Sequence, residues 1–174
     1  MNLYIANAAG ALSVIIFALS YQAEKRNTII LLNEIGRLLC VVQYVLLSAF
    51  EGAMMDIVGA VASILANKKD SGWVKRHLKG VIVGANTLIV VSGLMLYKSP
   101  ISLFPMFGIL FQTGALWFSQ EKHIRWVSFP GAPLWMVYNL TSRAYGTVVA
   151  DVMTTVSIAL AIFRYDIRPK MRAK

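Results

Sequence analysis

The chain has 174 residues, of which 57% are hydrophobic and only 14% are charged. Soluble domains carry about 25% charged residues, so this composition excludes a soluble globular protein and indicates a membrane protein. The net charge of +9 does not indicate nucleic-acid binding, because the Lys and Arg residues gather in alternate loops. Long apolar runs without strict alternation favour spanning helices over a β-barrel.

Hydropathy predicts seven membrane-spanning helices, near residues 3–21, 28–48, 53–67, 80–97, 101–119, 124–141 and 145–164. The third is short, and we expect it to begin inside the turn at 49–52. The sixth contains Pro130, Gly131 and Pro133, which predicts a kinked helix whose freed carbonyls are bonded by its neighbours. The N-terminus lacks the basic region of a signal peptide, so we expect it to remain as the first span.

The basic residues predict the orientation of these spans. Loops 22–27, 68–79 and 120–125 and the C-terminal end hold 14 of the 17 Lys and Arg residues. The opposite side holds only Lys98 and Arg143, and Arg37 falls inside a span. The positive-inside rule therefore predicts an outside N-terminus and an inside C-terminus, which requires an odd number of spans.

An internal repeat is visible in the sequence. Tyr44, Ser48 and Gly52 recur 94 positions later, at residues 138, 142 and 146, and a membrane-embedded aspartate follows each copy. Matching spans one to three with spans five to seven leaves span four as a linker, and copies four spans apart enter the membrane from the same side. The predicted fold is an all-α membrane protein of seven transmembrane helices, arranged as two parallel three-helix repeats plus a linker helix (3+1+3).

The repeat divides the chain into four parts. Residues 1–67 form the first repeat, and residues 68–100 form a basic cytoplasmic loop and the linker helix. Residues 101–166 form the second repeat, and residues 167–174 form a basic cytoplasmic tail.

This arrangement resembles the SWEET sugar transporters and the half-size bacterial SemiSWEETs. The likeness is strongest at Pro133-Leu-Trp135-x-x-Tyr138 and at Gly146-x4-Asp151. In the half-size transporters a tryptophan and an asparagine line the sugar site, and Trp135 and Asp151 fall on those positions. Asp151 stands where the sugar carriers have asparagine, and the Pro-Gln pair of the first span is missing.

The whole chain is more similar to the YgjV-type family of small bacterial inner-membrane proteins. The resemblance implies the fold and a multi-pass location in the bacterial inner (plasma) membrane. Nicotinamide-riboside carriers of the PnuC type share the helix arrangement. The motifs that carry the YgjV likeness are Leu103-Phe-Pro105-x-x-Gly108, Ala115-Leu-Trp-Phe, Trp135-x-Val137-x-Asn139 and Gly146-Thr147.

Asp56 and Asp151 are the first candidate site residues. A carboxylate that faces lipid costs about 2.5–3.5 kcal/mol or more, so both side chains should face the interior. One interpretation is a pseudo-symmetric pair that lines a central cavity and binds solute donors or a proton. The other is an acid in the first turn of each helix, favoured by the helix dipole and wetted from outside.

Glu34 and Arg37 are spaced i, i+3 on span two, which predicts a self-neutralising polar pair with a gating or packing role. Alternatively, Arg37 is an anion site or pairs with a carboxylate on another helix. Further substrate-binding candidates are aromatic or lone polar residues, for which packing and interhelical hydrogen bonding are the alternatives. They are Tyr44, Asn86, Gln112, Trp135 and Tyr138. The predicted hinges are Pro105, Gly108, Pro130 and Pro133.

The function expected from this pattern is transport of a small polar solute, such as a sugar or a nucleoside-like vitamin, by alternating access between the repeats. The carrier would be a facilitator or proton-linked. No nucleophile with a base, no phosphate-binding loop and no metal cluster appears in the sequence, so we expect neither an enzyme nor a cofactor. Expected partners are membrane lipids, the solute and protons, but no nucleic acid, and monomer and homo-oligomer both remain open. The alternative is a non-transporting scaffold or regulatory protein of the same fold.

Overall fold

The computed structural model describes residues 2–22 and 26–168, and within these ranges every regular element is helical. The all-helical class predicted from composition is confirmed for the described residues. The elements are α1 Asn2–Gln22, α2 Arg26–Leu46, α3 Phe50–Asn67, α4 Gly72–Arg76, α5 Leu78–Met95, the 3₁₀ turn η1 Pro100–Ser102, α6 Leu103–Ala115, α7 Glu121–Ser128, α8 Gly131–Thr141, α9 Tyr145–Ala161 and the π-helical turn η2 Ile162–Ile167.

Three helices in the described ranges are long and apolar enough to cross a membrane: Phe50–Asn67, Leu78–Met95 and Tyr145–Ile167. Leu3–Phe17 and Pro100–Ala115 are shorter apolar helices. The sixth predicted span is broken into α7 and α8, with the break at Phe129 and Pro130. Proline lacks a backbone N–H, and its ring clashes with the carbonyl four residues earlier, so a break at this position is expected.

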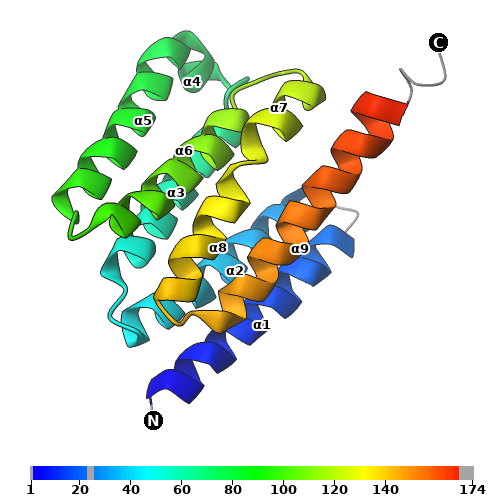
Figure 1. Cartoon of the computed structure of the whole chain (residues 1–174). Helices are drawn as coiled ribbons and strands as arrows, with labels where there is room; N and C mark the ends of the chain where they lie inside the picture. The colour runs from blue at the N-terminus through cyan, green and yellow to red at the C-terminus, as the bar shows by residue number, and fades with distance from the viewer. Residues whose placement is uncertain (1, 23–25, 169–174) are drawn as a thin grey trace.

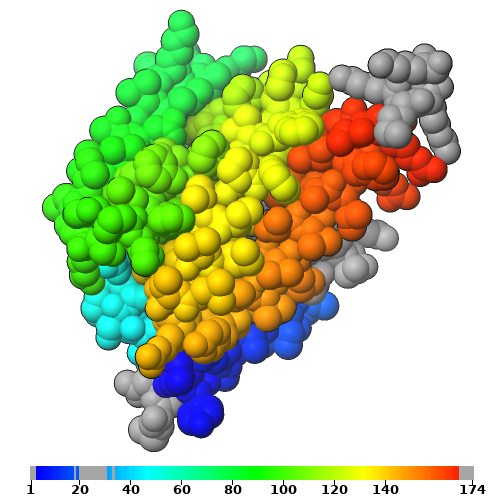
Figure 2. Space-filling model, viewed as in Figure 1, coloured from blue at the N-terminus to red at the C-terminus, as the bar shows by residue number. Residues whose placement is uncertain are grey.

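Six helices close into a ring. In order around it, α1 packs on α2, α2 on α3, α3 on α6, α6 on α8, α8 on α9, and α9 returns to α1. Helix α5 lies outside the ring, against α3 and α6 (Figure 1). The side chains of α8 and α9 meet over the half of this face nearer the turn that joins them (Figure 2). The ring therefore encloses an interior to which six helices contribute.

Two helix–helix turns in this ring have the same backbone geometry. Ser48 (φ 56°) lies just after the end of α2, and Arg143 (φ 59°) lies just after the end of α8. Both residues have left-handed backbone conformations. In each turn the N–H of the next residue donates a hydrogen bond to the carbonyl five residues earlier. Ala49 donates to the Tyr44 carbonyl (2.8 Å), and Ala144 donates to the Asn139 carbonyl (2.9 Å). This is the Schellman arrangement, which caps the last carbonyls of a helix.

The spacing of the two matched turns differs from the spacing of the identical residues in the sequence. Ser48 and Arg143 are 95 residues apart, whereas the identical residues of the predicted repeat are 94 residues apart. At the spacing of the turns Trp135 corresponds to Cys40, whereas at the spacing of the identical residues it corresponds to Val41. Asp56 and Asp151 lie at the same position after their turns.

The two ends of the molecule differ in charge. We call the end with residues 47–49, 96–99 and 142–144 the turn end, and the end with α4, α7 and η2 the basic end (Figure 1). The N-terminus lies at the turn end, where Lys98 and Arg143 are the only Lys or Arg among the described residues. The basic end carries Lys68, Lys69, Lys75, Arg76, Lys79, Lys122, Arg125, Arg164 and Arg168. Lys25 and the predicted tail beyond residue 168 lie outside the described residues.

Candidate functional site

A cavity of about 450 Å³ lies inside the ring, and all six ring helices contribute to its wall. Polar and charged side chains from both halves of the ring line the cavity. Helices α2 and α3 contribute Glu34, Arg37, Asp56 and Ser63, and helices α6 and α9 contribute Gln112, Asp151 and Thr154. A cavity with this lining can bind a polar or charged molecule within the membrane.

The cavity is closed toward the turn end by three buried aromatic side chains. Tyr44 and Trp135 stack with ring centroids 5.9 Å apart and an interplanar angle of 21°. Tyr138 lies edge-on to both, at 6.1 Å from each. Tyr44 and Trp135 line the cavity, whereas Tyr138 does not line it and lies behind them.

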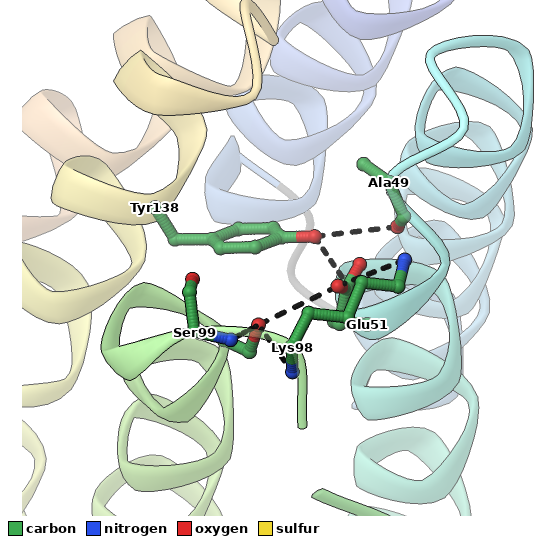
Figure 3. A network of polar contacts seen from close by, with 7 residues as sticks. Ala49, Glu51, Lys98, Ser99 and Tyr138 are labelled. Atoms are coloured by element: carbon green, nitrogen blue, oxygen red, sulfur yellow. Dashed lines mark hydrogen bonds and ion pairs between the residues drawn. The ribbon is translucent and has the colours of Figure 1, made fainter. Parts of the chain in front are cut away.

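Tyr138 instead bonds to the start of α3. Its hydroxyl accepts a hydrogen bond from the Gly52 N–H (2.9 Å) and donates one to the Ala49 carbonyl (3.3 Å) (Figure 3). A Cβ atom at Gly52 would lie 2.7 Å from the Tyr138 ring, so glycine is required for this approach. The tyrosine predicted to bind substrate is therefore engaged in holding α8 against α3.

A second polar group ties α3 to η1 at the same end. The Lys98 ammonium lies 3.1 Å from the Glu51 carboxylate. The Ser102 hydroxyl accepts bonds from the N–H groups of Lys98 and Ser99, both at 3.3 Å, and donates to Glu51 at 3.5 Å (Figure 3). Together with Tyr138, these contacts keep the turn end closed.

The two carboxylates have different partners. On α3, Asp56 pairs with the Arg37 guanidinium of α2 at 3.3 Å. A Cβ atom at Gly59 would lie 3.3 Å from Arg37 Nη1, so this glycine leaves room for the guanidinium to lie against α3. Within the described part of the chain no ion pair joins Arg37 to Glu34, so of the two pairings considered for Arg37 the structure has the one between helices.

Asp151 is held by a neutral group. Its Oδ2 accepts a hydrogen bond from Asn139 Nδ2 at 2.7 Å, and Asn139 Oδ1 accepts one from the Tyr44 hydroxyl at 2.8 Å. This chain links α2, α8 and α9 across the closed end of the cavity. Among residues 2–22 and 26–168, no Lys or Arg lies within ion-pair distance of Asp151.

The remaining candidates divide into those that reach the cavity and those that do not. Gln112 lines it and packs against Gly131, where a Cβ atom would lie 2.7 Å from the glutamine Cγ. Asn86, predicted to bind substrate, does not line it because α5 packs outside the ring. Sequence reasoning missed Ser63 and Thr147, small residues whose position on the cavity face only the packing reveals.

The proline and glycine positions predicted as hinges are packed in different ways. Pro105 is fully buried, and Pro130 and Pro133 lie at the start of α8. A Cβ atom at Gly108 would lie 2.7 Å from Trp135 Cδ1, so this glycine lets the indole lie against α6. Within the described residues no group of three or more His, Cys, Asp or Glu side chains is arranged to hold a metal ion.

Comparison with known proteins identifies a family. A family model described as Imp-YgjV, bacterial inner membrane protein, matches residues 4–168. No curated protein and no solved structure matches the chain. The matched range contains every residue that lines the cavity.

Proposed function

The chain belongs to the Imp-YgjV family of bacterial inner membrane proteins, and we propose that it is a multi-pass carrier for a small polar solute. In this proposal the spans form two parallel repeats, α1–α3 and α6–α9, in which the broken pair α7/α8 counts as one span and α5 is the linker. The solute binds in the central cavity, and rocking of one repeat against the other exposes it to each side in turn.

The order of the ring supports the repeat. Exchanging α1, α2 and α3 for α6, α8 and α9 maps each packed pair of helices onto another packed pair. The contacts between repeats, α3 with α6 and α9 with α1, also exchange. Two residue contacts in the first repeat also recur 95 positions later in the second. The contact of Ser13 with Cys40 corresponds to that of Gly108 with Trp135. The contact of Phe17 with Gly36 corresponds to that of Gln112 with Gly131.

The exposure of the cavity wall supports an inward-facing conformation. Tyr44 and Trp135, toward the turn end, are 2% and 4% exposed, whereas Asn67, at the last position of α3, is an exposed part of the wall. The cavity therefore extends from the closed turn end toward the basic end. The positive-inside rule assigns the basic end to the cytoplasm, with the N-terminus outside.

One observation carries the proposal: a polar, charged cavity lies between the two halves of a membrane-embedded ring. Charged side chains within a bilayer are costly and are generally found where they serve a binding site or a pathway. A protein that only holds a partner would be stable with a packed apolar interior. The proposed step is binding and release, without bond chemistry.

The interhelical contacts suggest how the ring would move. Helix α3 is tied to the second repeat at the turn end by Glu51 and Ser102. It is tied at the basic end by Lys69, whose ammonium donates to the carbonyls of Leu116 (3.2 Å) and Phe118 (2.6 Å). We therefore expect the α3–α6 contact to act as the axis and the α1–α9 contact to separate.

Cysteine labelling tests the inward-facing cavity. In a Cys40→Ala background, Thr154→Cys places a thiol on the cavity wall, and Val156→Cys places one on an outward position of α9 that is 51% exposed. In inverted membrane vesicles a charged methanethiosulfonate should modify residue 154 but not residue 156. In right-side-out vesicles neither should react. Absence of labelling at residue 154 from the cytoplasmic side would argue for a closed interior.

Solute binding is tested by a thermal-shift screen of sugars, nucleosides, vitamins and organic ions on the purified protein, because a ligand that binds only the folded state stabilises it. A hit should then be taken up by vesicles, and Asp56→Asn or Asp151→Asn should reduce uptake while the protein stays folded. If both variants are folded and neither alters binding or flux of any solute, the scaffold alternative is favoured.

A further inference from the structure

The charges on the cavity wall do not balance. Among the described residues, three carboxylates line the cavity, those of Glu34, Asp56 and Asp151, but only one guanidinium, that of Arg37. Arg37 is engaged with Asp56 at 3.3 Å. When all four groups are ionised the wall therefore has an excess of negative charge, and that excess is on Glu34 and Asp151.

Asp151 is the deeper of these two acids and the better positioned to bind a solute. It lies one turn beyond Thr147, which is 3% exposed, and its Oδ2 is bonded to the neutral Asn139 amide at 2.7 Å. The amide orients the carboxylate but supplies no opposite charge. A carboxylate at this depth in a bilayer favours a cation beside it.

A second, independent group points into the same cavity. Ser63 is 7% exposed, lines the wall, and its hydroxyl has no hydrogen-bond partner among the described residues. Buried hydroxyls are nearly always bonded, so this donor is available to a bound molecule. Ser63 follows Asp56 by two helical turns, about 10 Å along α3 toward the basic end.

The volume and the aromatic wall limit the kind of cation. A space of about 450 Å³ is far larger than a bare metal ion needs. Tyr44 and Trp135 form part of the wall beside the acids, and aromatic rings favour organic cations and apolar groups. The site therefore fits a solute with both a charged and an apolar part.

We propose that the transported solute is an organic cation whose ammonium group binds Asp151 and whose apolar part packs against Trp135. A polar group further along the solute bonds to Ser63. This assignment rests on the proposed carrier function and narrows its substrate class from polar solutes in general to organic ammonium cations. Arg37 keeps Asp56 from competing for the ammonium group.

Charge-matched probes test the assignment. The cations choline and phenethylammonium are compared with their neutral counterparts 3,3-dimethylbutan-1-ol and 2-phenylethanol, and with the anions 3,3-dimethylbutyrate and phenylacetate. Binding to the purified full-length protein is measured by thermal unfolding at constant ionic strength. We expect saturable stabilisation by at least one cation and by none of its counterparts.

Three variants locate the binding. Asp151→Asn keeps an oxygen for the Asn139 amide and should raise the Kd of the cation at least tenfold. Ser63→Ala loses no internal hydrogen bond, so the free protein should keep its stability while choline, which has a hydroxyl group, binds about 2- to 10-fold more weakly. Asp70→Asn removes an exposed acid outside the cavity and should leave the Kd unchanged.

The results separate this inference from the carrier proposal. Equal stabilisation by neutral or anionic counterparts, unchanged cation binding in Asp151→Asn, or no binding of either cation would overturn the substrate class. If a neutral sugar or nucleoside binds instead, the carrier proposal survives without this inference. If nothing binds and residue 154 is also unlabelled, both proposals fail.

Discussion

The contact between α1 and α9 closes the ring, and it depends on two glycines that meet backbone to backbone. A Cβ atom at Gly146 would lie 2.7 Å from the Gly10 carbonyl carbon and 2.8 Å from the Ala11 nitrogen. The Gly146 N–H also donates to Asn7 Oδ1 (3.4 Å), which accepts a second bond from Gln43 Nε2 (3.2 Å). The substitution Gly146→Ala therefore cannot be accommodated by turning a side chain, and α1 must move.

The expected cost follows from this geometry. Adding a methyl group to a well-packed contact typically costs about 1–3 kcal/mol. Alanine is favoured over glycine in a helix interior by up to about 1 kcal/mol, but Gly146 lies in the first turn of α9, where that gain is smaller. We expect a net loss of about 1–2 kcal/mol in the free energy of unfolding.

The matched control is Gly84→Ala on α5, where a Cβ atom would meet nothing within 4 Å. It should be neutral or stabilising by up to about 1 kcal/mol. The measurement is reversible unfolding in mixed micelles of mild detergent and sodium dodecyl sulfate, followed by tryptophan fluorescence. If Gly146→Ala proved as stable as Gly84→Ala, the close contact between α1 and α9 would be wrong.

Two further predictions concern the polar contacts. Arg37→Gln or Asp56→Asn alone should destabilise the protein by up to about 3 kcal/mol, because each leaves an unpaired charge, and the double variant should recover most of that loss. Additive losses in this double-mutant cycle would refute the pair. Tyr138→Phe leaves the buried Gly52 N–H without its partner and should cost about 1–3 kcal/mol. Tyr145→Phe, at a side chain that is 52% exposed, should change stability by less than about 0.5 kcal/mol, and equal effects of the two would contradict the role of Tyr138.

The helices were predictable because hydropathy is a local property of about 20 residues. The break at Pro130 was predictable for the same reason, since a missing N–H acts on the turn that contains it. The alignment of the predicted repeat is harder to read from the sequence. Tyr44 and Tyr138 are identical residues 94 positions apart, but at the spacing of the two turns Tyr44 corresponds to Asn139 and not to Tyr138. Residue identity and turn geometry therefore give different alignments of the predicted repeat.

The site was only partly predictable. Asp56 and Asp151 reach the cavity as expected, because the cost of exposing a carboxylate to lipid decides which way the side chain faces. Asn86 and Tyr138 are less strongly constrained, and only the packing of α5 and α8 decides that they lie elsewhere. Ser63 has no distinguishing signal in the sequence, since a serine is common on either face of a membrane helix.

The proposed duplication explains why the two acids differ in their partners. With the offset of 95, the position of Arg37 in the first repeat corresponds to Ala132 in the second, which is fully buried. No room exists there for a guanidinium, so Asp151 cannot form the ion pair that Asp56 forms, and Asn139 supplies a neutral bond instead. Arg37 therefore neutralises Asp56, whereas no Lys or Arg among the described residues neutralises Asp151. The positive group of the proposed solute would then bind at Asp151 rather than at Asp56.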